Sequence, residues 1–265
     1  MCKKVRRQLL IRPGAIGDFI VSLPAMEALC GDWTEVWCAR QNLPLATFAG
    51  AVQAIPDTGL DRLGFLPAEA TVSRLREFDS IISWYGSNNE QFQKLALDEL
   101  KLNITFLPAL PMGRGSALEF YRRQAFRLGA SRVGRYPQLT CPRMARTFAA
   151  IHPFASGSRK QTQLEVFENA ARRLANRMPV QWLRGPEDEL PDSTFISNLY
   201  ELACWLAGAR VYIGNDSGIA HLAAAVGTPV VALFPATDPA TWTPRGPAVS
   251  AIQPGHLSYS AAALE

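Results

Sequence analysis

The stretch RVYIGNDSGIAHLAAAVGTPVVALFPATDP, residues 210–239, decides which fold the sequence predicts. Residues 211–213 form a short apolar run that indicates a buried strand, and an Ala-rich helix is expected between Ser217 and Gly227. Residues 230–234 are apolar again and indicate a second buried strand. A strand–loop–helix–strand unit of this kind is typical of a parallel sheet in an α/β protein.

The start of that helix is the first candidate binding site. Asp216 or Ser217 is a natural N-cap, and the small residues Ser217 and Gly218 leave N–H groups of the first turn uncovered. An open helix start at the carboxyl end of a parallel strand binds anions, so we interpret it as the place for a diphosphate. An ordinary capped helix is the alternative. His221 lies one turn after Ser217 and can donate to a phosphate or hold the Asp216 loop, or can be a satisfied core histidine.

The composition is that of a globular chain. Of the 265 residues, 48% are hydrophobic and 19% charged, so one large or two medium domains can bury a core. The net charge of +4 is spread out, which excludes a nucleic-acid footprint and suits an anionic small ligand. Because no signal-type or spanning apolar segment is found, a cytoplasmic protein is expected. The histidines His152, His221 and His256 lack ligand spacing, so no metal site is expected. No cofactor is expected either.

Strands and helices alternate in both halves of the chain, as expected for two parallel-sheet α/β units. In the first half, strands are expected at residues 8–12, 35–39, 80–83 and 103–107, and helices at 19–29, 72–78, 91–100 and 117–128. In the second half, strands are expected at 148–152, 180–183 and 195–196, and helices at 164–175 and 199–206, with a Pro- and Gly-rich tail after residue 239. Pro24 is expected to kink the start of the first helix or to mark where its regular part begins. Residues 132–147 lack any period, so the predicted domains are 1–131 and 148–265, joined by a linker at 132–147.

Four loops of the second half follow strand ends and are expected to converge at one edge of the sheet, beside a cleft between the domains. They lie at residues 152–160, 185–189, 214–218 and 235–239. The first carries Ser156, Ser158, Arg159 and Lys160, which suit a phosphate, with a solvated basic loop as the alternative. Glu187 follows a strand end, where an acid can accept hydrogen bonds from both ribose hydroxyls. A carboxylate that complements a helix start is the alternative for Glu187.

In the first half, Asp18 follows a glycine-containing loop at the start of an expected helix. The loop consists of Gly14, Ala15, Ile16 and Gly17. The simplest interpretation of Asp18 is a carboxylate that caps the helix or complements its dipole. The functional alternative is a general base facing the cleft, because the glycines of the loop let an acceptor approach. The loop is no dinucleotide fingerprint, since a third glycine is missing at the required spacing.

Two blocks of the sequence resemble glycosyltransferase family 9, the ADP-heptose:lipopolysaccharide heptosyltransferase family. They are RPGAIGDFIVSLPA at residues 12–25 and GNDSGIAHLAAAVGTPVVALF at residues 214–234, and TDPATWTPRG at 237–246 fits as well. The resemblance implies a GT-B architecture, in which two Rossmann-like parallel-sheet domains face each other across a cleft. The N-terminal domain would hold the acceptor and the C-terminal domain the nucleotide-sugar.

The resemblance also implies a reaction and roles for single residues. The reaction is an inverting, metal-independent transfer of heptose or a related sugar from an ADP-linked donor to a lipopolysaccharide-type or other cell-envelope glycan or glycolipid. Asp18 matches the proposed base of the family, and Glu187 the position that binds the ribose. Asp216 and His221 match the family motif D-[ST]-G-x-x-H. The donors expected to stabilise the leaving diphosphate are Ser156, Ser158, Lys160, Ser217 and Gly218. Peripheral contact with the cytoplasmic face of the inner membrane is a further implication.

The sequence departs from the family pattern in three places. Lys160 is followed by Gln161-Thr162-Gln163 where the family continues K-x-W-P, so Arg159 competes with Lys160 for the phosphate. The N-terminal half and the tail after Pro247 are short. These departures motivate an alternative function, a non-catalytic nucleotide- or sugar-nucleotide-binding module on a trimmed GT-B fold.

Overall fold

The computed structural model describes residues 5–64, 69–113 and 115–253, so His256 lies outside the described residues. The described chain groups into two units. The first contains the residues up to Gly113 together with Phe120–Gly134, and the second contains residues 115–119 and those from Arg135 onward. Within these ranges, no helix is long and apolar enough to cross a membrane.

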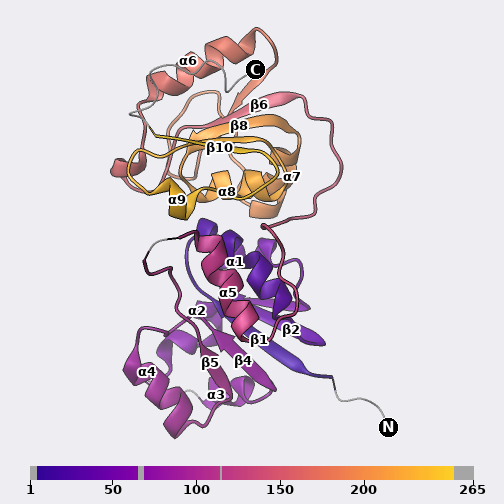
Figure 1. The fold of residues 1–265 in the computed structure, drawn as a ribbon, viewed down its shortest axis with the longest axis vertical. Helices are drawn as coiled ribbons and strands as arrows, with labels where there is room; N and C mark the ends of the chain where they lie inside the picture. The colour runs from indigo at the N-terminus through magenta and orange to yellow at the C-terminus, as the bar shows by residue number, and fades with distance from the viewer. Residues whose placement is uncertain (1–4, 65–68, 114, 254–265) are drawn as a thin grey trace. The chain divides into compact units, whose positions relative to one another are not determined.

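The first unit is built on a five-stranded parallel sheet with the strand order β3-β2-β1-β4-β5 (Figure 1). Its strands are β1 (Arg7–Arg12), β2 (Trp33–Cys38), β3 (Ala51–Ala54), β4 (Ser80–Ser83) and β5 (Ile104–Phe106). Its helices are α1 (Ile16–Ala28), α2 (Ile55–Thr58), α3 (Glu69–Leu75), α4 (Glu90–Lys94) and α5 (Ala117–Arg127), of which α5 begins with residues grouped with the second unit. Because β1 lies in the middle of the sheet, the loop after it reaches the centre of the carboxyl edge, where ligands of such sheets bind.

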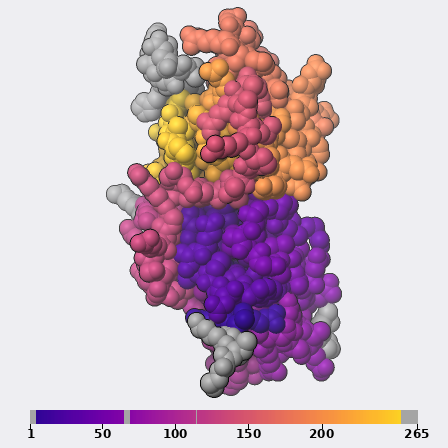
Figure 2. All heavy atoms as spheres, turned by 90° about the vertical axis from the view of Figure 1, so that its right-hand side faces the viewer, coloured from indigo at the N-terminus to yellow at the C-terminus, as the bar shows by residue number. Residues whose placement is uncertain are grey.

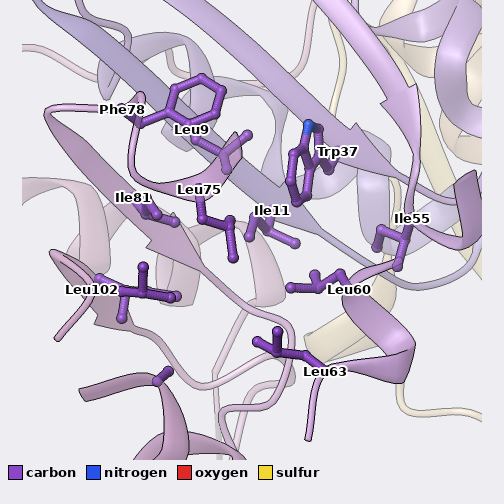
Figure 3. Close-up of a cluster of buried hydrophobic side chains, with 12 residues drawn as sticks. Leu9, Ile11, Trp37, Ile55, Leu60, Leu63, Leu75, Phe78, Ile81 and Leu102 are labelled. Carbon is purple, nitrogen blue, oxygen red and sulfur yellow. The ribbon is translucent and has the colours of Figure 1, made fainter. Parts of the chain in front are cut away.

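One hydrophobic core covers a face of this first sheet (Figure 3). Leu9 and Ile11 point to the same side of β1, because alternate residues of a strand share a face. They pack with Trp37 of β2, Ile81 of β4 and Leu75 of α3, all of which are less than 2% exposed. Burial of such side chains stabilises a fold by about 1.5–3 kcal/mol each, so this core holds β1, and with it the loop that carries Asp18, firmly in place.

The second unit repeats the architecture with the strand order β10-β9-β8-β6-β7. Its strands are β6 (Phe148–His152), β7 (Val180–Trp182), β8 (Ala209–Asn215), β9 (Val230–Leu233) and β10 (Val249–Ile252). Its helices are α6 (Leu164–Ala175), α7 (Leu199–Ala207), α8 (Gly218–Ala225) and α9 (Pro239–Trp242). The core on one face contains Phe167 and Leu174 of α6, Ile151 of β6 and Ile213 of β8. Here β8 is the central strand, so the loop before α8 lies at the middle of the carboxyl edge.

Most predicted elements are present, and four differ in an informative way. Helix α1 begins at Ile16, three residues before its predicted start, so Pro24 lies inside the helix and neither kinks its start nor marks it. Strands β3 and β10 are present where no strand was predicted. The short strand expected at residues 195–196 is wrong, since only Thr194 pairs there, in an isolated bridge with Leu183.

The segment that the sequence indicates as a linker has contacts with the second unit. Leu139 donates its N–H to the Ala225 carbonyl, and Arg146 donates to the Gly227 carbonyl. In Figure 2 this pink stretch lies across the face of the second unit that is turned to the viewer. Residues from Arg135 onward therefore group with the second unit, whereas the predicted linker and domain limits at 131 and 148 stay predictions.

Candidate functional site

The start of α8 is open, as the sequence predicts. Ser217 is the N-cap in extended backbone (φ −148°, ψ 164°), and its hydroxyl accepts the Ala220 N–H at 3.4 Å. In the part of the chain that the structure describes, the N–H groups of Ser217 and Gly218 donate to no protein acceptor. Ser217 and Gly218 are both half-buried. Unused, accessible N–H groups at the positive end of a helix dipole attract an anion.

Three loops of the second sheet meet at the Asp216 carboxylate, which precedes this helix start. Lys160, at the end of a 3-10 turn after β6, donates its Nζ to Asp216 Oδ2 at 3.1 Å. Thr237, in the loop after β9, donates its hydroxyl to the same oxygen. Asp216 is 4% exposed and Lys160 is partly exposed. A buried carboxylate thus holds an ammonium group beside an open helix start. Of the four loops predicted to converge, those after β6, β8 and β9 meet at this carboxylate.

The backbone around this cluster is fixed by Asn215 and Gly214. Asn215 is fully buried; its amide donates to the Pro153 carbonyl at 2.6 Å and its oxygen accepts the Thr162 N–H at 3.2 Å. A Cβ on Gly214 would lie 2.4 Å from the Tyr212 hydroxyl and 2.8 Å from the His152 carbonyl. Only glycine fits at this place, because Tyr212 fills the space that any side chain would need.

His221 lies on the buried face of α8 with an exposed fraction of 5%. Burial lowers the pKa of His221 to about 4; Asp216 opposes this shift, while Lys160 and Arg245 add to it. His221 is therefore neutral near pH 7 and belongs to the support of the site. Because the charge of Arg245 lowers the pKa of His221, this exposed arginine lies near the cluster. Sequence reasoning missed Arg245, although it lies in the block of residues 237–246.

A second buried pair lies beneath the same helix start. The Tyr212 hydroxyl is 3.3 Å from His152 Nδ1. Burial lowers the pKa of His152 to about 4, against the opposing effect of Asp188. His152 is thus a neutral, supporting histidine at the end of β6, which sequence reasoning considered only as a possible metal ligand.

The remaining predicted donor residues lie outside the Asp216 cluster. Ser156, Ser158 and Arg159 are exposed on the loop after β6. Glu187 is also exposed, on the loop after β7, whereas its neighbour Asp188 accepts the Gly185 N–H at 2.7 Å. The structure brings Lys160, and not Arg159, to Asp216. These exposed side chains can bind a ligand only at the solvent side of the cluster.

In the first unit, Asp18 lies in the first turn of α1 and is half-buried. Its Oδ2 accepts the Ala15 N–H at 3.3 Å, which leaves the other carboxylate oxygen available. Gly14 has φ +111°, a conformation that side chains disfavour, and a Cβ there would lie 3.3 Å from Asp18 Oδ2. The loop before α1 is therefore shaped to leave the Asp18 carboxylate uncovered on its Gly14 side. Gly17 and Ile16 belong to the helix itself.

Sequence comparison matches the second unit to a known family. The family model described as "Glycosyltransferase family 9 (heptosyltransferase)" matches residues 197–262, which include Asp216, Ser217 and His221. A curated relative, lipopolysaccharide heptosyltransferase 3 of Escherichia coli, is 50% identical over 44 residues. That stretch is 17% of this chain and spans only 13% of the length of the relative.

Comparison with solved structures extends the likeness to both units. The glycosyl transferase family 9 protein of Veillonella parvula has a TM-score of 0.73 and 15% identity, over 96% of this chain and 87% of that one. E. coli heptosyltransferase WaaC with ADP has a TM-score of 0.68 and 19% identity, over 93% of both chains. E. coli ADP-heptose lps heptosyltransferase II has a TM-score of 0.67 and 16% identity, over 93% of this chain and 90% of that one.

At these identities the solved structures show the fold, and the fold is that of two-domain GT-B heptosyltransferases. The family model supplies the sequence evidence, in the unit that carries the open helix start. Together, the matched residues 197–262 and the shared fold of both units confirm the resemblance to glycosyltransferase family 9 that the sequence predicts.

Proposed function

We propose that this chain is an inverting glycosyltransferase that needs no metal ion and moves a heptose or related sugar from an ADP-linked donor to a lipopolysaccharide-type glycan. The observation that carries the proposal is the open start of α8 with Lys160 held beside it by Asp216. A cation and two unused N–H groups at the carboxyl edge of a parallel sheet form a site for a diphosphate. The Lys160 ammonium then supplies the positive charge that a divalent cation provides in other nucleotide-sugar enzymes.

Asp18 is the proposed general base. Its carboxylate accepts the proton of an acceptor hydroxyl while that oxygen forms a bond to the anomeric carbon of the donor sugar. The attack comes from the face opposite the diphosphate, so the configuration at the anomeric carbon inverts. The Ala15 N–H bond to Oδ2 orients the carboxylate and leaves its second oxygen for the acceptor.

The leaving diphosphate takes the electron pair of the sugar–oxygen bond, and its negative charge grows as that bond breaks. Lys160 and the N–H groups of Ser217 and Gly218 are in place before the reaction, so they stabilise this charge without reorganisation. Asp216 does not itself contact the anion in this proposal. Asp216 holds the Lys160 ammonium group in position, and this contact offsets the entropy that the flexible lysine side chain loses when it is ordered.

The choice of donor and acceptor is supported by the relatives. One solved structure of E. coli WaaC contains ADP, and another, at a TM-score of 0.63 and 18% identity, contains ADP-2-deoxy-2-fluoro heptose. The curated relative is named for lipopolysaccharide. An ADP-linked heptose and a lipopolysaccharide-type acceptor are therefore the first pair to test, and peripheral contact with the inner membrane stays a prediction.

The test is a donor panel in two stages. Thermal stabilisation of the chain is measured first with ADP-, UDP-, GDP- and dTDP-linked sugars. Transfer is then measured as loss of the sugar from the best donor in the presence of cell-envelope extract from a heptose-deficient strain. We expect selective stabilisation by the ADP-linked sugar and its acceptor-dependent consumption. Stabilisation without turnover on any acceptor would contradict the proposal.

A further inference from the structure

Arg12, the last residue of β1, is a buried cation without an acidic partner. Its exposed fraction is 1%, and within the described residues no carboxylate lies within ion-pair distance of its guanidinium group. Glu35 in the same sheet is buried as deeply, but it accepts a hydrogen bond from Arg74 at 2.6 Å. Burying an unpaired charge is costly unless its donors are satisfied, so the contacts of Arg12 indicate its role.

The guanidinium of Arg12 binds both ends of the loop that leads to Asp18. Nη1 donates to the Pro13 carbonyl at 3.1 Å, and Nη2 donates to the Asp18 carbonyl at 2.9 Å. Nε donates to Ser22 Oγ, one helical turn further along α1, at 2.9 Å. One side chain thus ties the end of β1, the loop and the first two turns of α1 together.

Other buried groups complete this clamp. Asn42, which is fully buried, donates its amide to the Gly14 carbonyl at 3.2 Å, so the middle of the loop is held as well. The Tyr121 hydroxyl of α5 accepts a hydrogen bond from Arg12 Nη2 at 2.8 Å and donates to the Ala109 carbonyl at 2.7 Å. The loop that presents Asp18 is therefore held in place by side chains from distant parts of the sequence.

Arg12 and Asp18 also act on each other's surroundings by charge. Burial raises the pKa of Tyr121 to about 12, while Arg12 lowers it and Asp18 raises it. Both charges therefore reach the same hydroxyl. The guanidinium carbon lies 4.9 Å from the ring centre of Tyr121 and 5.8 Å from that of Trp84, so aromatic faces replace the missing counter-ion.

We propose that Arg12 is a positioning residue for the reaction. Its guanidinium fixes the loop of residues 13–18 through the backbone and keeps a positive charge behind the carboxylate of Asp18. The inference rests on the proposed role of Asp18 as the base. Arginine suits this task because its planar fork donates to several acceptors at fixed angles, whereas lysine offers a single ammonium group on a flexible stem.

Turnover of three variants tests the proposal. Arg12→Gln removes the charge and most of the donors, and we expect kcat to fall by about 10²-fold because the base is misplaced. The KM for the acceptor and the thermal stabilisation by ADP should change little. Arg12→Lys should recover part of the loss. Arg76→Gln is the matched control, since it removes an exposed arginine of the same unit, bonded to the Leu100 carbonyl and away from this loop, and should keep the wild-type kcat. A wild-type kcat in Arg12→Gln would overturn the proposal.

Amide hydrogen exchange gives a second readout that does not depend on activity. In Arg12→Gln, the amides of Ala15 and Phe19 should exchange faster than in the wild type, because both belong to the loop and first turn that Arg12 holds. The Gly50 amide, bonded to the Thr34 carbonyl, should be unchanged. If the wild type transfers no sugar but the exchange differs as expected, the proposed function fails, and with it the catalytic part of the inference, while the hold of Arg12 on the loop stands.

A milder variant covers the case in which Arg12→Gln fails to fold. Tyr121→Phe keeps the cation and removes one hydroxyl that accepts from it. We expect the same changes in kcat and in Ala15 exchange, but smaller. Wild-type exchange at Ala15 together with wild-type kcat in Tyr121→Phe would overturn the proposal.

Discussion

The two units use the same backbone design with opposite charges. In each, the central strand of a five-stranded parallel sheet runs into a loop and then a helix, α1 after β1 and α8 after β8. At α1 the carboxylate of Asp18 lies in the first helical turn and the buried cation, Arg12, lies behind the loop. At α8 the carboxylate of Asp216 is buried and the cation, Lys160, lies on the more exposed side.

The acidic side chain is the more exposed one at α1, and the basic side chain is the more exposed one at α8. This difference indicates what each helix start can bind. The buried member of each pair fixes the loop, and the more exposed member is available to a ligand. An available carboxylate accepts a proton, whereas an available ammonium with open N–H groups binds an anion. In the proposed function, the same strand–loop–helix unit therefore serves an acceptor hydroxyl in one unit and a diphosphate in the other.

Removing the available acid should give the largest effect. Asp18→Asn keeps the shape of the side chain but cannot take a proton, so kcat for transfer should fall by about 10²–10⁴-fold. The measurement is the initial rate of sugar transfer at saturating donor. Asp57→Asn, an exposed carboxylate in the same unit, is the control and should keep the wild-type rate. Near-normal turnover of Asp18→Asn would contradict the assignment of the proton acceptor to the start of α1.

The buried histidines of the second unit should make stability depend on pH. His152 and His221 have their pKa lowered from 6.5 to about 4 by burial, so the unfolded chain takes up these protons first. The contribution of the two neutral histidines to the free energy of unfolding is fully present above pH 6.5, and it is lost as the pH falls toward 4. The loss should approach about 3 kcal/mol for each histidine.

Urea denaturation at pH 7.5, 6 and 5 measures this dependence. A His221→Gln variant should show a flatter profile than the wild type, because one of the two groups no longer titrates. An equal slope in the variant and the wild type would mean that His221 is not held neutral at the start of α8.

Removing the available cation should weaken donor binding by a smaller factor. Lys160→Met keeps the length of the side chain but leaves the buried Asp216 carboxylate, among the residues that the structure describes, with the Thr237 hydroxyl as its one remaining hydrogen-bond partner. A charge-assisted hydrogen bond contributes about 1.5–3 kcal/mol, so the Kd for ADP should rise roughly 10–100-fold. Calorimetric titration with ADP measures it. Arg159→Met is the matched control; a raised Kd there with a wild-type Kd in Lys160→Met would assign the phosphate contact to Arg159 instead.

The smallest effect should come from the cap of α8. Ser217→Ala removes the hydroxyl that accepts the Ala220 N–H, which should reduce the stability by about 1 kcal/mol. Urea denaturation near pH 7.5 measures the change. Ser250→Ala, at an exposed serine of β10 in the same unit, is a comparison variant for which a smaller loss is expected. If Ser217→Ala has the same free energy of unfolding as the wild type, the cap contributes nothing to the stability of this helix start.

Much of this arrangement follows from the sequence. Apolar runs next to Gly and Pro signals predict β8, α8 and β9, and the parallel order then brings Lys160 and Asp216 together. The sequence does not predict strand β10, because VSAI is a short segment that follows a Pro- and Gly-rich stretch, which indicates a loop. Its pairing with β9 supplies the stability that its own composition lacks.

The support of Asp18 could not be predicted in the same way. A single arginine at the end of a strand usually marks the point where the chain reaches solvent, and its burial depends on Tyr121, 109 residues away. The sequence itself shows only that a basic residue, Arg12, follows the apolar run Leu9–Ile11. Contacts between distant residues, rather than local pattern, decide whether such a charge is buried.

We propose that binding of the donor and transfer of the proton belong to different helix starts. The most direct measurement is the Kd for ADP and the kcat for transfer in Asp18→Asn and Lys160→Met, determined side by side with the wild type. We predict that Asp18→Asn keeps the wild-type Kd and loses turnover, whereas Lys160→Met raises the Kd. Loss of ADP binding in Asp18→Asn, or an unchanged Kd in Lys160→Met, would contradict the account.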